Sequence, residues 1–259
     1  FTTAGTLILN NASIFNNAGT TSATAGFQIN NSAQFNNQSG GSFSTGGLTL
    51  ANTTSISNAG TIAFSGALVA NGTNVITNSG GTYSSNGITL NGTAGIASSF
   101  VASGGTMNVT SDLRVHNGSF TLSGANVTAT IVAFDDAGNS SGHLNINSGS
   151  LTITRPDFGI FRSGGTQTVN FSLNSTGSLS FTQIGNAENL IFGGLITLND
   201  ITYTNLNYTT VFNVTHPTGT STLITLVATV PEPSTYAAII GAACFGLIAL
   251  RRRRMARVS

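Results

Sequence analysis

The sequence predicts an all-β protein: a right-handed parallel β-helix with rungs of about 20 residues, followed by one C-terminal membrane helix. Two observations predict the β-helix. Apolar residues recur at a fixed interval along residues 1–100, and apolar and polar residues alternate within each repeat, which is the period of a half-buried strand. An apolar run that ends in four arginines predicts the membrane helix.

The repeat becomes visible when each copy is aligned on one apolar position. These anchors follow one another at intervals of 20 or 21 residues, and further apolar residues stand eight and six positions before each anchor. A unit of this length cannot bury its own apolar face, but stacked units bury the faces of their neighbours. The anchors are Phe15, Phe35, Ile56, Ile76 and Ile96; the two preceding columns are Leu7, Phe27, Leu48, Leu68 and Ile88, and Leu9, Ile29, Leu50, Ala70 and Leu90.

Asparagine recurs in two further columns, five positions before the anchor and two positions after it. Stacked asparagines form ladders of side-chain amides, so we expect these residues to hold the turns together rather than to bind a ligand. The columns are Asn10, Asn30, Ala51, Asn71 and Asn91, and Asn17, Asn37, Asn58, Asn78 and Ser98.

The period loosens after residue 100, but segments such as Gly118–Leu122 keep an order of glycine, polar, apolar, polar and apolar residues. No stretch before residue 236 has helical periodicity. We therefore expect regular solenoid repeats in residues 1–100, an irregular continuation in 101–189 and capping strands in 190–229. The capping strands are expected at Leu190-Ile191-Phe192, Val211-Phe212 and Leu223 to Val230.

The tail has three parts: a short linker motif at 230–235, an uncharged apolar run at 236–250 and a basic end at 251–259. As a helix, the run spans about 22 Å, which is short of the ~20 residues that usually cross a bilayer. Snorkelling arginines and local thinning of the bilayer close such a gap. Basic residues stay on the cytoplasmic side, so residues before Pro231 are expected outside the cytoplasm. The linker is Val230, Pro231, Glu232, Pro233, Ser234 and Thr235, and the membrane stop is Arg251, Arg252, Arg253 and Arg254.

This order of a Pro-Glu-Pro motif, an apolar span and an arginine cluster resembles the PEP-CTERM sorting signal of Gram-negative bacteria. The resemblance implies that exosortase, a cysteine protease–transpeptidase of the inner membrane, removes the tail near residues 231–233. Glu232 and its two flanking prolines would then be recognition elements, not catalytic ones. The resemblance also implies a matrix or biofilm context, with exopolysaccharide as a further partner. The Gly-Asn-Ser-Thr repeats resemble those of autotransporter passengers and of many PEP-CTERM proteins.

Composition fits an exported protein. Charged residues make up 6% of the chain, against a usual ~25%, and one cysteine, Cys244, excludes a disulfide framework. Before residue 231 the acidic residues outnumber the arginines, so this part has no electrostatic footprint for nucleic acid. Phe1 stands in mid-repeat without a signal peptide, so we expect a chain trimmed at its N-terminus.

Catalytic chemistry has few candidate residues, and we assign no catalytic, cofactor-binding or metal residue. A glycosidase needs two carboxyl groups roughly 5–10 Å apart, and the acids are sparse. Two alternatives stay open: a calcium site at Asp135 and Asp136, and a site or surface ion pair formed by Asp157 with Arg155 and Arg162. The histidines have no partners at metal-binding spacing. The acids before the tail are Asp112, Asp135, Asp136, Asp157, Glu188 and Asp200, and the histidines are His116, His143 and His216.

An ice-binding solenoid is another class to consider, because it presents a regular threonine array on one face. Thr49 and Thr89 stand between apolar neighbours, but Ile8, Gln28 and Val69 fill the matching places in the other copies. The array in this column is therefore broken.

These observations predict an exported, exosortase-processed structural or adhesive protein of the cell surface or extracellular matrix, with no catalytic activity of its own. Its expected partners are exosortase, the inner membrane through residues 236–250, and exopolysaccharide; nucleic acid is not expected. The alternative is a β-helix polysaccharide lyase or glycosidase that the same tail delivers. Convergence of two of the listed acids in one groove would favour this alternative.

Overall fold

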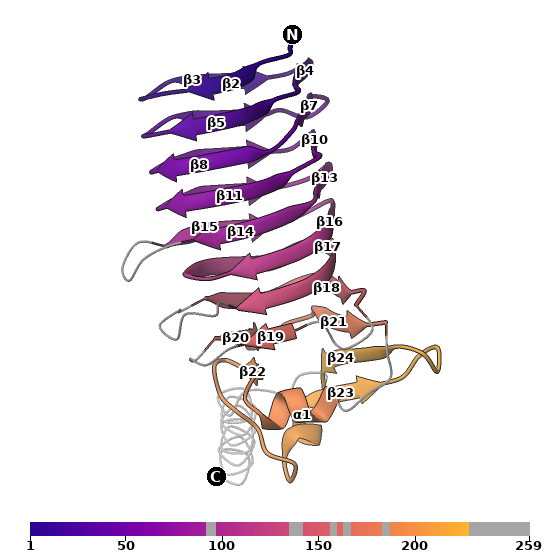
Figure 1. Ribbon diagram of the computed structural model, residues 1–259. Coiled ribbons are helices and arrows are strands. Elements are labelled where there is room, and N and C mark those ends of the chain that lie inside the picture. Colours follow the sequence, from indigo (N-terminus) through magenta and orange to yellow (C-terminus); the bar gives the residue numbers. More distant parts are fainter. Residues whose placement is uncertain (92–96, 135–141, 156–159, 163–166, 183–186, 228–259) are drawn as a thin grey trace, which may run out of the picture. The chain divides into compact units, whose positions relative to one another are not determined.

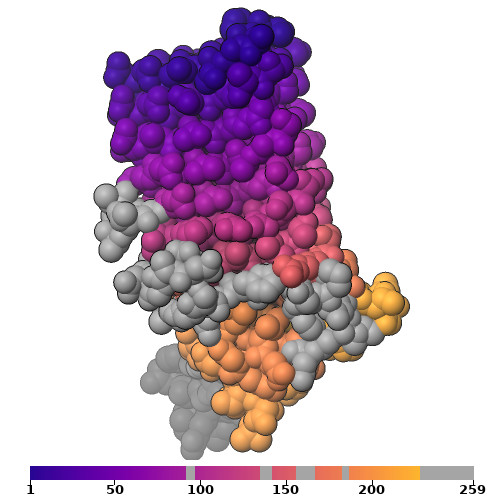
Figure 2. All heavy atoms as spheres, viewed as in Figure 1, coloured from indigo at the N-terminus to yellow at the C-terminus, as the bar shows by residue number. Residues whose placement is uncertain are grey.

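The computed structural model describes residues 1–91, 97–134, 142–155, 160–162, 167–182 and 187–227. Residues Phe1–Leu226 form one compact unit, a parallel β-solenoid in which each turn of the chain lies on the turn before it (Figure 1). Figure 2 shows the same succession, from the indigo first turn to the orange and yellow last elements of this unit. The predicted solenoid is thereby confirmed.

Each turn contributes one strand to each of three stacks, which we name A, B and C in the order in which the chain passes through them. Stack A contains β2 (Thr6–Leu9), β5 (Gly26–Asn30), β8 (Leu48–Asn52), β11 (Ala67–Gly72), β14 (Gly87–Asn91), residues 112–115 of β16 (Thr106–Val115), residues 131–134 of β17 (Gly118–Phe134) and β19 (Ile160–Arg162).

Stack B contains β3 (Ile14–Asn17), β6 (Gln34–Asn37), β9 (Ser55–Asn58), β12 (Val75–Asn78), β15 (Ser98–Ala102), residues 118–122 of β17, residues 143–146 of β18 (His143–Ile153), β20 (Thr168–Phe171) and β22 (Ile196–Leu198). Stack C contains β1 (Thr2–Thr3), β4 (Thr20–Ala23), β7 (Ser42–Thr45), β10 (Thr61–Phe64), β13 (Thr82–Ser85), residues 106–109 of β16, residues 126–129 of β17, residues 150–153 of β18 and β21 (Ser178–Phe181).

The predicted apolar columns point into the solenoid and stack in register. Phe15 pairs with Phe35 and Phe35 with Ile56 in stack B, while Leu7 pairs with Phe27 in stack A. Aromatic rings bridge the stacks; the centroids of Phe35 and Phe43 are 4.6 Å apart. Alternate residues of each strand therefore supply the buried core, as the period of two requires.

The fifth repeat departs from the predicted alignment. Ile76 pairs with Phe100 and not with Ile96, which lies outside the described residues. Ser98, which we aligned with Asn78, instead stacks on Asn74 of the preceding turn. The Nδ2 atom of Asn74 donates to the Ser98 hydroxyl at 3.2 Å. The connection between β14 and β15 is longer than the corresponding connections in the preceding turns, so a constant period of 20 residues assigns the wrong residues here.

One predicted asparagine column forms a buried ladder at the corner between stacks B and C. The Nδ2 atoms of Asn17, Asn37 and Asn58 donate to the Oδ1 atoms one turn further on, at 2.7, 2.8 and 2.6 Å. These side chains also bond to the backbone, as in Asn37 Nδ2 to the Thr61 carbonyl at 3.0 Å. Because the amides satisfy one another and the turn, a column of polar groups is buried without unpaired atoms. The other predicted column also forms amide bonds, between Asn10 and Asn30 and between Asn71 and Asn91.

Glycines next to the buried ladder allow the turns to approach closely. Gly81 and Gly105 have φ of +63° and +72°, a conformation that glycine adopts at little cost. A Cβ on Gly81 would also overlap the carbonyl oxygen of Gly60 in the preceding turn. The sharp corner between stacks B and C thus depends on glycine and asparagine together.

The last elements of the unit change direction. After the helix α1 (Ala187–Phe192), strand β22 and the 3₁₀ helix η1 (Tyr208–Thr210), strands β23 (Phe212–Thr215) and β24 (Thr222–Leu226) form an antiparallel pair, and β24 pairs antiparallel with β21. The strand predicted at 190–192 is wrong. Ala187 and Ile191 lie one helical turn apart and are both buried, as expected for one face of a helix, and Gly194 ends the helix with φ +69°.

We predict that Asn58→Ala lowers the free energy of unfolding by roughly 2–4 kcal/mol, because it breaks two ladder bonds and leaves buried partners unsatisfied. Asn36→Ala is the matched control: it removes one bond, to Asn16 at 2.9 Å, at the surface, and should cost less than about 1 kcal/mol. Urea unfolding followed by circular dichroism measures both. Equal losses in the two variants would contradict a special role of the buried ladder.

Tyr83 gives a second prediction. Its ring is buried between Phe64 and Phe100, and its hydroxyl lies near the Ser85 side chain without a hydrogen bond of normal geometry. Burial raises the pKa of this phenol far above its usual value, an effect that the Ser85 side chain offsets only in part. Since an unpaired buried hydroxyl costs about 1–3 kcal/mol, Tyr83→Phe should leave stability unchanged or raise it.

The same variant should change how the stability of the folded protein depends on pH in the alkaline range. The unfolded phenol ionises near pH 10 while the folded one stays protonated, so the folded state loses stability as pH rises above that value. Tyr83→Phe should remove this contribution, and Tyr208→Phe, at a half-buried ring, controls for the loss of a hydroxyl. Thermal melts from pH 8 to 11 measure the effect; a Tyr83→Phe protein that is less stable than wild type throughout would show that the hydroxyl has a partner.

Candidate functional site

The residues of the predicted sorting signal follow the last strand directly in the chain. Strand β24 ends at Leu226, and Val230, Pro231, Glu232, Pro233, Ser234 and Thr235, the apolar run and Arg251, Arg252, Arg253 and Arg254 all lie outside the described residues. Within the part of the chain that the structure describes, no helix is both long enough and apolar enough to span a membrane.

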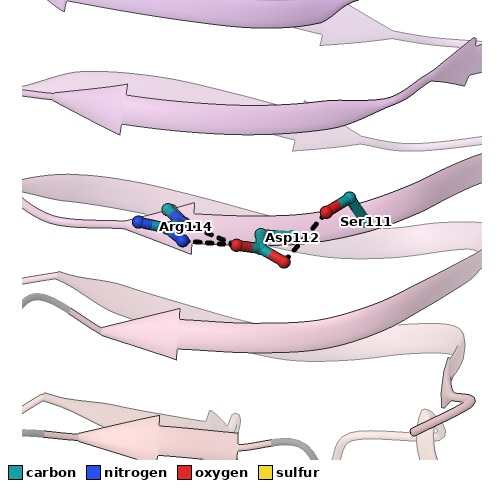
Figure 3. A network of polar contacts seen from close by, with 3 residues as sticks. All are labelled: Ser111, Asp112 and Arg114. Atoms are coloured by element: carbon teal, nitrogen blue, oxygen red, sulfur yellow. Dashed lines mark hydrogen bonds and ion pairs between the residues drawn. The ribbon is translucent and has the colours of Figure 1, made fainter.

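Of the candidate acids, Asp112 lies on the solenoid wall and is paired. It stands two residues before Arg114 on β16, and side chains two apart on a strand share a face. Arg114 donates from Nε to the Asp112 carboxylate at 2.8 Å and from a second nitrogen at 2.5 Å, and Ser111 donates to the other carboxylate oxygen at 3.0 Å (Figure 3). With 47% of Arg114 exposed, this ion pair is worth about 0–1 kcal/mol.

The structure does not bring a second described carboxylate to Asp112. Glu188 lies in the first turn of α1, and Asp200 stands at a turn after β22 with φ +61°. Asp135, Asp136 and Asp157, and with them the two alternatives left open at those residues, lie outside the described residues. Among the residues described, no group of three or more His, Cys, Asp or Glu side chains could hold a metal ion.

The histidines lie at separate places. His143 is on β18 beside Ser119 and Thr168 of the adjoining turns, and His116 follows β16. His216 lies between β23 and β24, where its Nδ1 is 3.2 Å from the Thr222 hydroxyl. The three histidines thus belong to different elements of the described chain.

A shallow groove of about 210 Å³ runs over the first turns of stack A. Its lining contains no titratable group, and its polar side chains include Gln28 and Thr49. It is lined by Thr6, Ala25, Gly26, Phe27, Gln28, Gly47, Leu48, Thr49 and Ala67.

Stack C carries a feature that the sequence did not reveal. Its outward positions form two columns of small polar residues in register, which we name the hydroxyl face. Every outward position of stack C from β4 to β21 is serine or threonine except Ala63, Asn108 and Asn126. The columns are Thr20, Ser42, Thr61, Thr82, Thr106, Asn126, Ser150 and Ser178, and Ser22, Ser44, Ala63, Ser84, Asn108, Thr128, Thr152 and Ser180.

A signal for this face was present in the strand pattern. Segments such as Thr20–Ala23 and Thr82–Ser85 alternate outward hydroxyls with buried residues. The column tested for a threonine array belongs to stack A instead, where Thr49 pairs with Gln28 and Val69. That column is broken, as predicted, whereas the two columns of stack C keep serine or threonine at every position except Ala63, Asn108 and Asn126.

Comparison with protein families matches residues 229–254 to the PEP-CTERM protein-sorting motif. The chain carries a PEP-CTERM sorting signal. This motif implies an exported protein that is targeted to exosortase. Its body is the β-solenoid described above. Comparison with the curated proteins and with the solved structures gives no significant match.

Proposed function

We propose that the protein is a structural or adhesive component of the cell surface or extracellular matrix, without catalytic activity of its own. The observation that carries this proposal is the union of a sorting signal with a body of stacked turns. Such a body is a stiff scaffold, because each turn is bonded to the next along all three stacks and through amide ladders inside a corner. A scaffold of this kind displays long, regular surfaces outside the cell.

Delivery follows from the chemistry of the tail. Residues 236–250 enter the inner membrane and Arg251, Arg252, Arg253 and Arg254 hold the end of the chain in the cytoplasm. This anchor is transient, because exosortase removes it near Pro231, Glu232 and Pro233.

The pairing of Asp112 supports a non-catalytic body. A retaining or inverting glycosidase needs two carboxyl groups facing one substrate, and Asp112 contacts Arg114 and Ser111 instead.

We predict that mass spectrometry of the protein recovered from the medium finds a C-terminus near residue 232. Glu232→Ala with Pro233→Ala should keep the intact chain in the membrane fraction, while Ser221→Ala, in the exposed loop before β24, should not change processing. Intact wild-type tail in the medium would contradict the delivery proposal.

A separate prediction concerns catalysis. Neutral and acidic polysaccharides incubated with the protein should show neither new reducing ends nor the absorbance of unsaturated lyase products. Asp112→Asn gives the matched background. Product formation that Asp112→Asn abolishes would replace the structural proposal with the carbohydrate-active enzyme.

A further inference from the structure

We propose that the hydroxyl face of stack C binds a neutral polysaccharide that lies along the solenoid, across successive turns. The inference rests on the proposed function, because only an exported scaffold comes into contact with extracellular polysaccharides. It goes beyond that proposal by naming the surface and the class of partner. Four properties of the face favour such a ligand: side-chain hydroxyls that are not used within the protein, a regular repeat, the absence of charge and the lack of large apolar side chains.

Most hydroxyls of the face have no partner within the described protein. From β4 to β13 the outward serines and threonines make no side-chain hydrogen bond, although their backbones are paired on both sides from β7 onward. Further along, Ser150 donates to Asn126 at 2.8 Å, and the Thr152 and Ser180 hydroxyls lie 2.9 Å apart. The first turns thus present donors and acceptors that face outward, as β4, β7, β10 and β13 lie one below another in Figure 1.

The repeat of the face suits a polymer. Neighbouring turns are about 4.8 Å apart and outward residues on one strand about 6.6 Å apart. The turn spacing is close to the advance per ring of an extended pyranose chain, so successive sugar rings would meet successive turns. The spacing is rigid, because Asn37, Asn58 and Asn78 form the buried ladder at the adjoining corner.

The charge of the face selects the class of polymer. None of the outward residues of stack C, from β4 to β21, is charged. In the solenoid as a whole, acidic residues outnumber arginines. An anionic polysaccharide or nucleic acid would therefore gain no ion pair here and would meet a weakly repulsive field. A neutral polysaccharide carries hydroxyls that both donate and accept, and it pairs with serine, threonine and asparagine alike.

Other occupants fit less well. The cores of stable protein interfaces are apolar, and the exposed large apolar residues of the described chain, such as Ile8, Ile14 and Val75, lie on stacks A and B or in loops and termini. A second copy of the chain would therefore bury hydroxyls against hydroxyls. A crystal surface such as ice requires identical spacing at every position, and Ala63, Asn108 and Asn126 interrupt the array.

Binding by such a face should depend on the length of the ligand. One hydrogen bond exchanged with water contributes only about 0.5–1.5 kcal/mol, so a single sugar should not bind measurably. Contacts on successive turns belong to one chain and act together. Affinity should then rise with the number of rings until the polymer spans the face.

The test uses the full chain in mild detergent and a variant with Thr61→Val, Thr82→Val and Thr106→Val. Valine keeps the shape and strand preference of threonine but removes the hydroxyl, from three adjacent turns of one column. The control carries Thr49→Val, Thr77→Val and Thr121→Val, which point outward on stacks A and B. Circular dichroism establishes that both variants are folded.

Affinity electrophoresis with galactomannan, mixed-linkage β-glucan and alginate, and calorimetry with a size series of β-gluco-oligosaccharides, measure binding. We expect binding to at least one neutral polymer, stronger with longer oligosaccharides, weakened about tenfold or more in the stack C variant and unchanged in the control. Retention by alginate alone, an equal loss in both variants, or no binding to any polymer would overturn the proposal.

Two further measurements separate the other occupants. Inhibition of ice recrystallisation that the stack C variant loses would identify an ice-binding face, and dimers in sedimentation that the variant loses would identify a self-association face; either result overturns the proposal. The C-terminus found by mass spectrometry is independent of all these readouts. Failure of polysaccharide binding with normal tail removal would therefore refute this inference and leave the delivery proposal intact.

Discussion

The fold depends on the register between successive turns. A slip of one residue would turn every inward side chain outward, because the side-chain period of a strand is two. Apolar packing resists such a slip, and the asparagines add a directional constraint: Nδ2 reaches Oδ1 at 2.6–2.8 Å only when Asn37, Asn58 and Asn78 are aligned. Apolar burial thus supplies most of the stability, and the buried amides fix the alignment.

The sequence predicted the fold wherever the turns have equal length. Constant spacing placed Leu48, Leu68 and Ile88 in one column, and the structure pairs them so. The prediction failed at Phe100, because a longer connection precedes β15 and periodicity cannot locate an insertion. It also failed at α1, whose six residues are too few to show a helical period above the background of apolar residues.

The sorting signal and the hydroxyl face differ in how much of the fold they need. The signal is linear, so the order of Glu232, the apolar run and Arg251 identifies it without any structure. The hydroxyl face exists only after the chain has been divided among three stacks. Thr20-x-Ser22 and Thr82-x-Ser84 lie far apart in sequence, and their shared orientation follows from the pairing of β4, β7, β10 and β13. Composition alone describes all such residues as polar.

The outward positions differ among the stacks although the same backbone supports all three. Stack A mixes Ile8, Gln28 and Thr49 in one column, and stack B places Ile14 beside Gln34. Solubility demands only polar residues on average, so it accounts for the variety of stacks A and B but not for the uniformity of stack C. A surface that presents serine or threonine at most positions of successive turns is suited to a partner that repeats as well.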